Sequence, residues 1–184
     1  MFDFEKLLIT HCSPTFAGIK PSNLLTISKK QCSNINSLIT LYNNILNNKN
    51  IYISVINEEK DFYLLLVYNK NFLWDLLNIK NYKNLLISYG YCFKDLNYLL
   101  NTLKLRFTKC NFPHEIGAFL GYPYTDIICF INNKGKNYKA IGAWKVYSSL
   151  SYSLFIFEKY SKCKNLFYNM ILSGMSFKDI IYII

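Results

Sequence analysis

The sequence predicts an α+β fold: a single domain in which a small, mostly antiparallel sheet of about four strands packs with several helices. Two segments rich in β-branched and aromatic residues, 51–57 and 61–69, are separated by a short charged stretch, which predicts an antiparallel hairpin. Segment 31–48 instead repeats its apolar residues with the period of an α-helix. The order of helical and strand patterns along the chain favours helices packed on one small sheet.

The first half of the chain is predicted to alternate helices and strands. A short helix over 2–9 leads into a turn-rich segment, and SNLLTIS at 22–28 follows as the first strand. An Asn-rich run at 47–50 ends the next helix before the hairpin. The apolar face of that helix is formed by residues at helical spacing: Ile35, Leu38, Ile39, Tyr42, Ile45 and Leu46.

The pattern from 71 to 107 is helical, and Gly90 breaks it. A short helix is expected within 112–123, since it has a proline near its start and is stopped by Gly121 and Pro123.

Thr125 is expected to cap a second short helix that ends at Gly135. The segment 138–148 is long and apolar enough for a final, central strand. The apolar spacing over 152–172 predicts the last helix.

Length and composition place the chain among ordinary globular proteins. Its 184 residues fit one domain, 1–184, and are enough to close a core. A hydrophobic content of 52% excludes a disordered chain, and seven Gly and four Pro exclude a collagen-like or linker-dominated protein.

The net charge of +10 comes from 21 basic and 11 acidic residues, and all but one of the basic residues are lysines. The exception is Arg106, although arginine is the usual bidentate reader of phosphates and guanine edges. The abundance of Asn, Ile, Lys and Tyr is typical of A/T-rich coding, so part of the charge reflects codon bias. Specific nucleic-acid binding is therefore not favoured.

The cysteines and the hydropathy indicate a soluble, cytoplasmic protein. The N-terminus lacks the charged and apolar regions of a secretory signal, and no stretch reaches the ~18 apolar residues of a membrane span. The thiols are then expected to be reduced. The absence of a C-x-x-C pair argues against an all-cysteine metal site. The six cysteines are Cys12, Cys32, Cys92, Cys110, Cys129 and Cys163.

The segment 11–20, HCSPTFAGIK, gathers a histidine, a cysteine, a glycine turn and a lysine. Nearby cations lower the pKa of a thiol, so His11 and Lys20 would favour Cys12 as a nucleophile or ligand. The alternative is a core position for Cys12, because cysteine is among the most often buried residue types.

The segment 112–123, FPHEIGAFLGYP, holds the only other histidine of the chain. His114 and Glu115 are candidates for an acid/base pair, and together with His11 and Cys12 they form one conceivable metal-ligand set. The alternative is structural: His114 caps a helix and Glu115 favours its positive end.

The segment 134–147 places a glycine between two lysines before GAWKVY. Lysine ammonium and backbone N–H groups can hold a phosphate or carboxylate, although the spacing is not that of a P-loop. Lys145 alternates with Trp144 and Val146 and is expected on the opposite face of the strand, where a plain surface lysine is the alternative. The predicted ligand contacts are His11, Lys20, Lys136, Trp144, Lys145 and Tyr147.

These segments resemble a bacterial family catalogued as domain of unknown function 3793, common in anaerobic clostridia-like bacteria. The motifs that carry the resemblance follow the family's order over most of the chain: HC-x-PT-x-AGIK at 11–20, FPHEIG-x-FLGYP at 112–123, KG-x-x-Y into G-x-WKVY at 134–147, and Phe157, Tyr160 and Cys163. The resemblance implies a single-domain, cytoplasmic bacterial protein. It implies no activity, because the family has none assigned.

The first functional hypothesis is a small-molecule-binding protein or enzyme whose site is formed by the segments 11–20, 112–123 and 134–147. A small anionic ligand is expected, with Lys20 and Lys145 as anion contacts; the sequence specifies no cofactor or metal. The alternative is a non-catalytic regulatory or interaction module, for which the resemblance implies a redox or iron-related protein partner. Weak, non-specific nucleic-acid binding is the third hypothesis.

Overall fold

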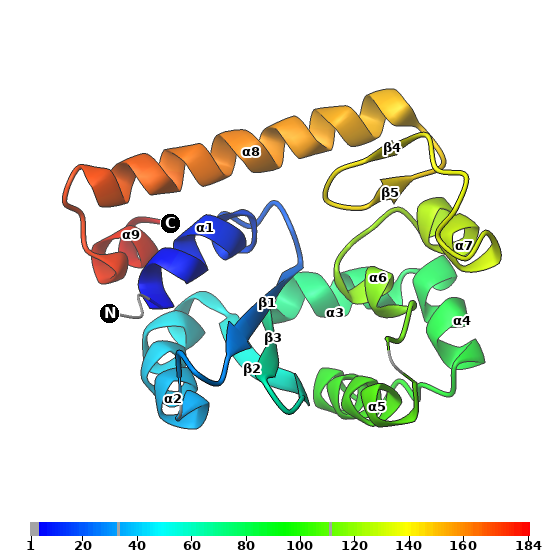
Figure 1. Cartoon of the computed structure of the whole chain (residues 1–184), viewed down its shortest axis with the longest axis horizontal. Helices are drawn as coiled ribbons and strands as arrows, with labels where there is room; N and C mark the ends of the chain where they lie inside the picture. Colours follow the sequence, from blue (N-terminus) through cyan, green and yellow to red (C-terminus); the bar gives the residue numbers. More distant parts are fainter. Residues whose placement is uncertain (1–3, 33, 111) are drawn as a thin grey trace.

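A three-stranded antiparallel sheet lies at the centre of the structure, a computed structural model that describes residues 4–32, 34–110 and 112–184. Its strands are β1 (Ser22–Ser28), β2 (Ile51–Glu58) and β3 (Phe62–Asn69), in the spatial order β1-β3-β2. A separate two-stranded hairpin pairs β4 (Ala140–Ile141) with β5 (Lys145–Val146) (Figure 1). The predicted α+β class with a small antiparallel sheet is confirmed, although the sheet has three strands rather than about four and the last two strands form a separate pair.

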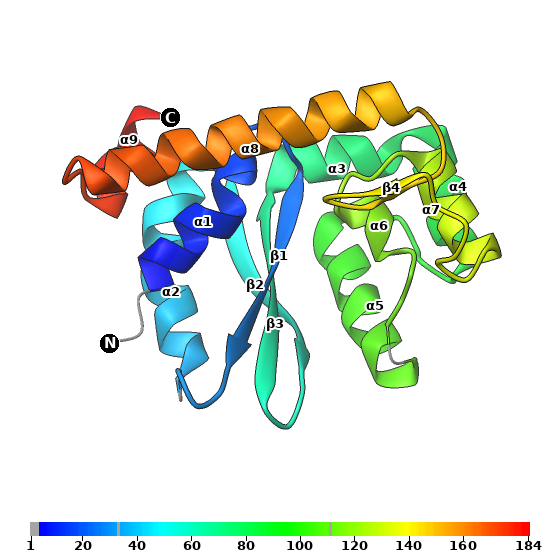
Figure 2. The same cartoon turned by 45° about the horizontal axis from the view of Figure 1, so that its top comes forward.

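The helices of the described residues fall into groups on either side of the central sheet (Figure 2). The first face is covered by α1 (Phe4–Phe16), α2 (Ile35–Leu46) and α9 (Phe177–Ile183). A short 3₁₀ helix, η1 (Asn47–Lys49), follows α2. The second face is covered by a longer series: α3 (Lys70–Asn78), α4 (Lys80–Ser88), α5 (Leu96–Lys109), α6 (Ile116–Phe119) and α7 (Tyr124–Asn132).

Alternation along β3 divides the apolar side chains between two cores. Leu65 and Val67 face the α1–α2–α9 side, whereas Leu64 and Leu66 face the α3–α7 side. In β2 the same alternation places Ile51 and Ile53 in the first core and Ile56 in the second, and the pairing register with β3 shifts between Val55 and Asn57.

The helix α8 (Leu150–Leu172) connects the two sides of the molecule. It begins next to the β4–β5 hairpin, packs against α1, and ends next to α9 (Figures 1 and 2). No helix in the described part of the chain is both long enough and apolar enough to cross a bilayer, as the sequence predicted.

Several predicted elements are confirmed. The strand at 22–28, the 51–58/62–69 hairpin and the last long helix form as expected. Gly90 has a φ of 86° and breaks the helical region, which splits into α3, α4 and α5.

The first helix is longer than predicted and includes the whole HCSPTF stretch at 11–16. Phe4, Leu8, Cys12 and Phe16 recur every four residues and are all buried, a helical pattern that the proline in the last turn obscured. Gly18, with a φ of 67°, then ends the helix. Residues 2 and 3 of the predicted helix, and residue 33 of the next, lie outside the described residues.

The prediction of a central strand over 138–148 is wrong. The Gly142 N–H donates to the Trp144 carbonyl at 3.0 Å, so the chain turns back on itself and forms only the short β4–β5 pair. Thr125 does not cap α7 either, because the helix begins at Tyr124 directly after Pro123. The helix α9 was not predicted.

Candidate functional site

Two cavities adjoin the β4–β5 hairpin and share part of their walls. The first, of about 330 Å³, is here called the His114 cavity; its lining includes Phe112, His114, Ile116, Tyr122, Ile127, Phe130, Ile141, Trp144 and Lys145. The second, of about 460 Å³, is called the Lys20 cavity; its lining includes Pro14, Lys20, Asn23, Tyr122, Phe157, Tyr160, Ser161 and Lys164. Leu24, Leu120, Tyr122, Gly142 and Ala143 line both.

The hairpin is held in place by a buried carboxylate of α7. Asp126 accepts the Trp144 indole N–H at 2.7 Å and the backbone N–H groups of Tyr147 and Ser148 at 3.0 and 2.7 Å. Three donors satisfy a carboxylate that is otherwise costly to bury. This contact fixes the wall of the His114 cavity.

The His114 cavity is mostly apolar, and its titratable lining residues other than tyrosine are His114, Lys145 and Asp126, whose carboxylate already accepts three N–H groups of the hairpin. The His114 ring lies edge-on to Phe130, with centroids 5.1 Å apart. The Lys145 ammonium donates to the Gly135 carbonyl at 2.8 Å, which leaves two of its protons for another acceptor. Trp144 is buried and Lys145 is half-buried, and both line this cavity although alternation predicted opposite faces for them.

Tyr122 lies between the two cavities and is the aromatic side chain that lines both. Its ring packs against Trp144 with centroids 5.3 Å apart. Burial raises the pKa of the Tyr122 phenol to about 12, so the group is a neutral donor at physiological pH.

The three predicted segments converge at the Lys20 cavity. Segment 11–20 contributes Pro14 and Lys20, segment 112–123 contributes Tyr122, and segment 134–147 contributes Gly142. The remaining wall comes from α8 and from Asn23 and Leu24 of β1.

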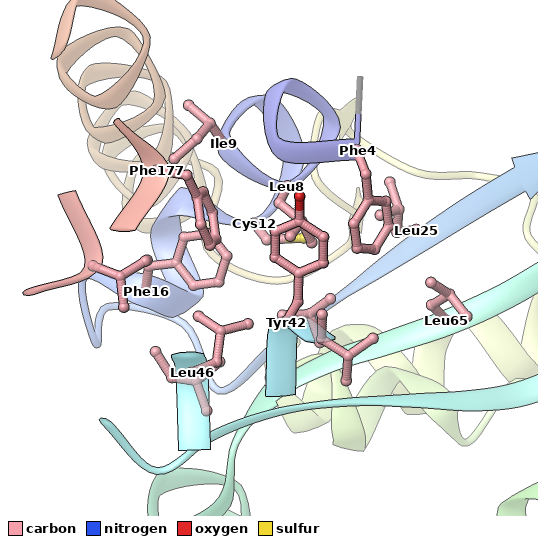
Figure 3. Close-up of a cluster of buried hydrophobic side chains, with 14 of the residues drawn as sticks. Phe4, Leu8, Ile9, Cys12, Phe16, Leu25, Tyr42, Leu46, Leu65 and Phe177 are labelled. Carbon is pink, nitrogen blue, oxygen red and sulfur yellow. The ribbon is translucent and has the colours of Figure 1, made fainter. Parts of the chain in front are cut away.

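Cys12 lies in the core between α1 and the sheet rather than at either cavity (Figure 3). Its side chain is 0% exposed, and burial raises the pKa of the thiol to about 12. The thiolate that a nucleophile or metal ligand requires is therefore disfavoured. Its neighbour His11 is exposed on α1, and partial burial and the charge of Lys164 lower the pKa of His11.

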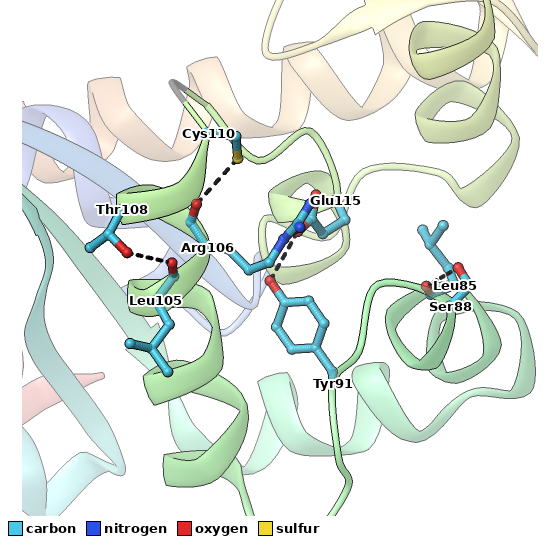
Figure 4. A network of polar contacts seen from close by, with 8 residues as sticks. All are labelled: Leu85, Ser88, Tyr91, Leu105, Arg106, Thr108, Cys110 and Glu115. Atoms are coloured by element: carbon cyan, nitrogen blue, oxygen red, sulfur yellow. Dashed lines mark hydrogen bonds and ion pairs between the residues drawn. The ribbon is translucent and has the colours of Figure 1, made fainter.

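Glu115 points away from the His114 cavity. Its Oε1 accepts from the Arg106 Nε at 2.7 Å and from the Tyr91 hydroxyl at 3.2 Å (Figure 4). Burial and the neighbouring carboxylate raise the pKa of Tyr91. The carboxylate is thus the centre of a buried polar network that joins α5 to α6, and the predicted His114–Glu115 acid/base pair is not assembled.

The remaining predicted contacts separate from the cavities. Lys136 is exposed and lines neither cavity. The Tyr147 backbone N–H anchors the hairpin, and its hydroxyl is buried without a hydrogen-bond partner among the described residues. Those residues also contain no group of three His, Cys, Asp or Glu side chains able to hold a metal ion, so the set His11, Cys12, His114 and Glu115 is not brought together.

Sequence reasoning missed several residues that build the site. Asp126 had no local signal, because its partners lie about twenty residues away. Lys164 appeared only as one of many lysines. Phe157 and Tyr160 were visible as motif residues of the family, and both line the Lys20 cavity.

Comparison with known proteins identifies the family of the chain. No curated protein and no solved structure matches it. A family model described as "Protein of unknown function (DUF3793)" matches residues 8–181, which include every segment that forms the two cavities. The chain therefore belongs to the DUF3793 family.

Proposed function

We propose that this protein binds a small molecule with an apolar or aromatic body and a negatively charged group, and that the His114 cavity is its binding site. The observation that carries the proposal is the cavity of about 330 Å³ with an aromatic lining and Lys145 at its wall. Concave, mostly apolar sites with a few polar groups are typical of small-molecule binding.

The positions of the polar groups define the expected ligand. Phe130 and Trp144 offer flat apolar surfaces to a ring or chain. The Lys145 ammonium, held by the Gly135 carbonyl, offers a fixed positive charge to a carboxylate or sulfonate. His114 is a second polar contact on the same cavity.

The proposal concerns binding rather than catalysis. A general acid or base needs a group that orients it and tunes its pKa, and Glu115 instead faces Arg106 and Tyr91. Cys12 is buried away from both cavities. Binding of an anionic, partly apolar ligand is what the arrangement supports best.

Two fluorescent probes test the proposal. The aromatic sulfonate 1-anilinonaphthalene-8-sulfonate has the expected chemistry, and N-phenyl-1-naphthylamine has nearly the same rings without the charge. In a Trp74→Phe variant Trp144 is the only indole, so energy transfer from it reports probe binding, and the Lys145 variant described next assigns that binding to the cavity. We expect efficient transfer and tighter binding of the sulfonate.

Lys145→Met and Lys139→Met form a matched pair. Both lysines belong to the hairpin region and both donate to a backbone carbonyl, Lys145 to Gly135 and Lys139 to Ser148, but only Lys145 lines the cavity. Lys145→Met is expected to weaken sulfonate binding about tenfold and to leave the uncharged probe unaffected. Equal effects of the two variants, or no energy transfer from Trp144, would overturn the proposal.

A second candidate function, the non-catalytic interaction module, is favoured by one observation. The outer surface of α8 exposes large apolar side chains: Leu150, Tyr152, Leu154, Phe155, Leu166 and Leu172. The absence of a concave site near His114 would have favoured this function further, but the His114 cavity is such a site. Sedimentation velocity over a range of concentrations tests whether a second copy of the chain covers this surface.

We place the protein in the cytoplasm, consistent with six free cysteines.

A further inference from the structure

We propose that the Lys20 cavity is a second, separate binding site, which takes a phosphate group between Lys20 and Lys164. The inference does not depend on the function proposed for the His114 cavity. It rests on a buried lysine without a carboxylate partner, on a second lysine in the same cavity, and on neutral donors around them.

Lys20 is the buried charge that requires a partner. Its side chain is 5% exposed, yet no carboxylate of the described residues lies within ion-pair distance of it. Buried lysines are otherwise almost always paired, because an isolated ammonium group loses its hydration. The side chain lines a cavity of about 460 Å³, so an anion can reach it.

Two tyrosine rings compensate part of this cost. The Lys20 Nζ lies 5.7 Å from the ring centroid of Tyr122 and 5.7 Å from that of Tyr160. Cation–π contacts at this distance are weak compared with the hydration that the ammonium gives up. The two rings therefore pack near the amine but do not replace the hydration energy that its charge loses on burial.

Lys164 of α8 adds a second positive charge to the same cavity. Its charge and the burial of Lys20 together lower the pKa of Lys20 to about 8, with burial the larger cause. The neighbouring Cys12 thiol stays protonated, so it supplies no negative charge. Lys20 is still mostly protonated at neutral pH, and two ammonium groups then face one space.

Two like charges in one cavity favour a doubly charged ligand over a singly charged one. A phosphate group carries a charge of about −1.5 to −2 at neutral pH and has three strong acceptor oxygens. Asn23 and Ser161 also line the cavity and can donate to those oxygens. The Thr15 hydroxyl fixes Asn23 by donating to its Oδ1 at 2.7 Å. A phosphate-bearing ligand therefore matches both the charge and the donors.

Isothermal titration calorimetry with inorganic phosphate tests this site, with chloride added to keep the ionic strength constant. The full-length protein is compared with Lys20→Met, Lys164→Met and Lys162→Met. The last is the matched control, because Lys162 is on the same helix but is exposed and paired with Glu158 at 2.6 Å. We expect at least about a tenfold loss of affinity in the first two variants and none in the control.

The choice of a dianion is tested with benzoate, a single negative charge on an apolar ring. In competition with phosphate, the dissociation constant of benzoate is expected to be at least about tenfold higher than that of phosphate. Comparable affinities would overturn the assignment to phosphate. Absence of phosphate binding would overturn the site. An equal loss of phosphate affinity in Lys162→Met and Lys164→Met would show only surface electrostatics and would also overturn it. Lys164→Met keeps the test decisive if Lys20→Met does not fold.

Discussion

Because of Lys20, the free energy of unfolding is expected to increase with pH. The folded pKa of about 8 is below the ordinary value of 10.5, so between these values the unfolded chain binds more protons than the folded one. Wild-type stability relative to Lys20→Met therefore rises as the pH increases through 8. From about pH 7 to about pH 9.5 the gain should be about 2 kcal/mol, measured by urea unfolding.

The comparison with Lys20→Met removes competing effects. Cys12 and Tyr122, whose pKa values burial raises, are present in both proteins and cancel in the difference. Lys162→Met, which removes an exposed lysine, should show no such trend. A difference that is flat across this pH range would mean that the Lys20 amine is hydrated in the folded protein.

The Arg106–Glu115 pair is predicted to stabilise the fold and to have no part in ligand binding. Glu115 is 1% exposed and Arg106 is 27% exposed, so Glu115→Gln leaves a guanidinium that only partly reaches water. We expect the free energy of unfolding, measured with urea, to fall by about 2 kcal/mol. Glu158→Gln, at an exposed ion pair, should leave stability unchanged.

Probe binding separates this structural role from a functional one. The folded Glu115→Gln protein should bind the naphthalene sulfonate with unchanged affinity, because Glu115 does not line the His114 cavity. A loss of binding at unchanged stability would instead return Glu115 to the site.

At the residue scale the candidate site residues differ in where the structure places them. Lys20, His114 and Lys145 line cavities. Cys12 and Glu115 do not, although each directly adjoins or follows a histidine in the sequence. On a helix or turn, adjacent side chains point in different directions, so adjacency in sequence does not predict adjacency in a site.

At the scale of elements, the β4–β5 hairpin depends on one carboxylate. Asp126→Ala would leave the Trp144 indole N–H and the N–H groups of Tyr147 and Ser148 without their acceptor. We expect a destabilisation of about 3 kcal/mol and loss of naphthalene sulfonate binding, because the hairpin forms part of the cavity wall. Hydrogen exchange at the two backbone amides should become faster.

The exposed Asp75 of α3 provides the control. Asp75→Ala should alter neither the exchange of the hairpin amides nor probe binding. Unchanged exchange in Asp126→Ala would show that the Gly142 turn and the packing of Trp144 on Phe157, with ring centroids 4.5 Å apart, hold the hairpin without the carboxylate.

The elements that sequence reasoning predicted well are those with a local period. The strands at 22–28, 51–58 and 62–69 and the helix α8 carry such patterns. The hairpin was predicted as one long strand because its apolar residues continue through Gly142, whereas contacts with the distant Asp126 and Phe157 hold the turned chain. The helix α9 is short, but Ser176 caps it through the Asp179 N–H, a signal present in the sequence.

At the scale of the whole molecule, the Lys20 cavity lies where the two sides of the structure meet, whereas the His114 cavity is lined from the second side and the hairpin. The residues of the first core come mainly from both ends of the chain, and those of the second core from its middle. The helix α8 begins beside the hairpin and packs against α1 (Figure 1), so its residues line the Lys20 cavity together with Lys20, which lies between α1 and β1 in the sequence. This long-range convergence of segments has no local signature and explains why Lys164 was missed.

The net charge of +10 is a property of the whole surface, and it predicts weak, sequence-independent attraction to DNA. Exposed lysines such as Lys134, Lys136 and Lys162 are distributed over different elements, and the single arginine is engaged with Glu115. Contact with about four phosphates would make affinity for a random duplex fall about a hundredfold between about 50 and 200 mM salt. Fluorescence anisotropy should give the same curve for two unrelated duplexes, and Lys20→Met should not change it, since Lys20 is buried. A preference of more than about tenfold for one duplex would show base readout instead, and would make nucleic acid a specific ligand of this fold.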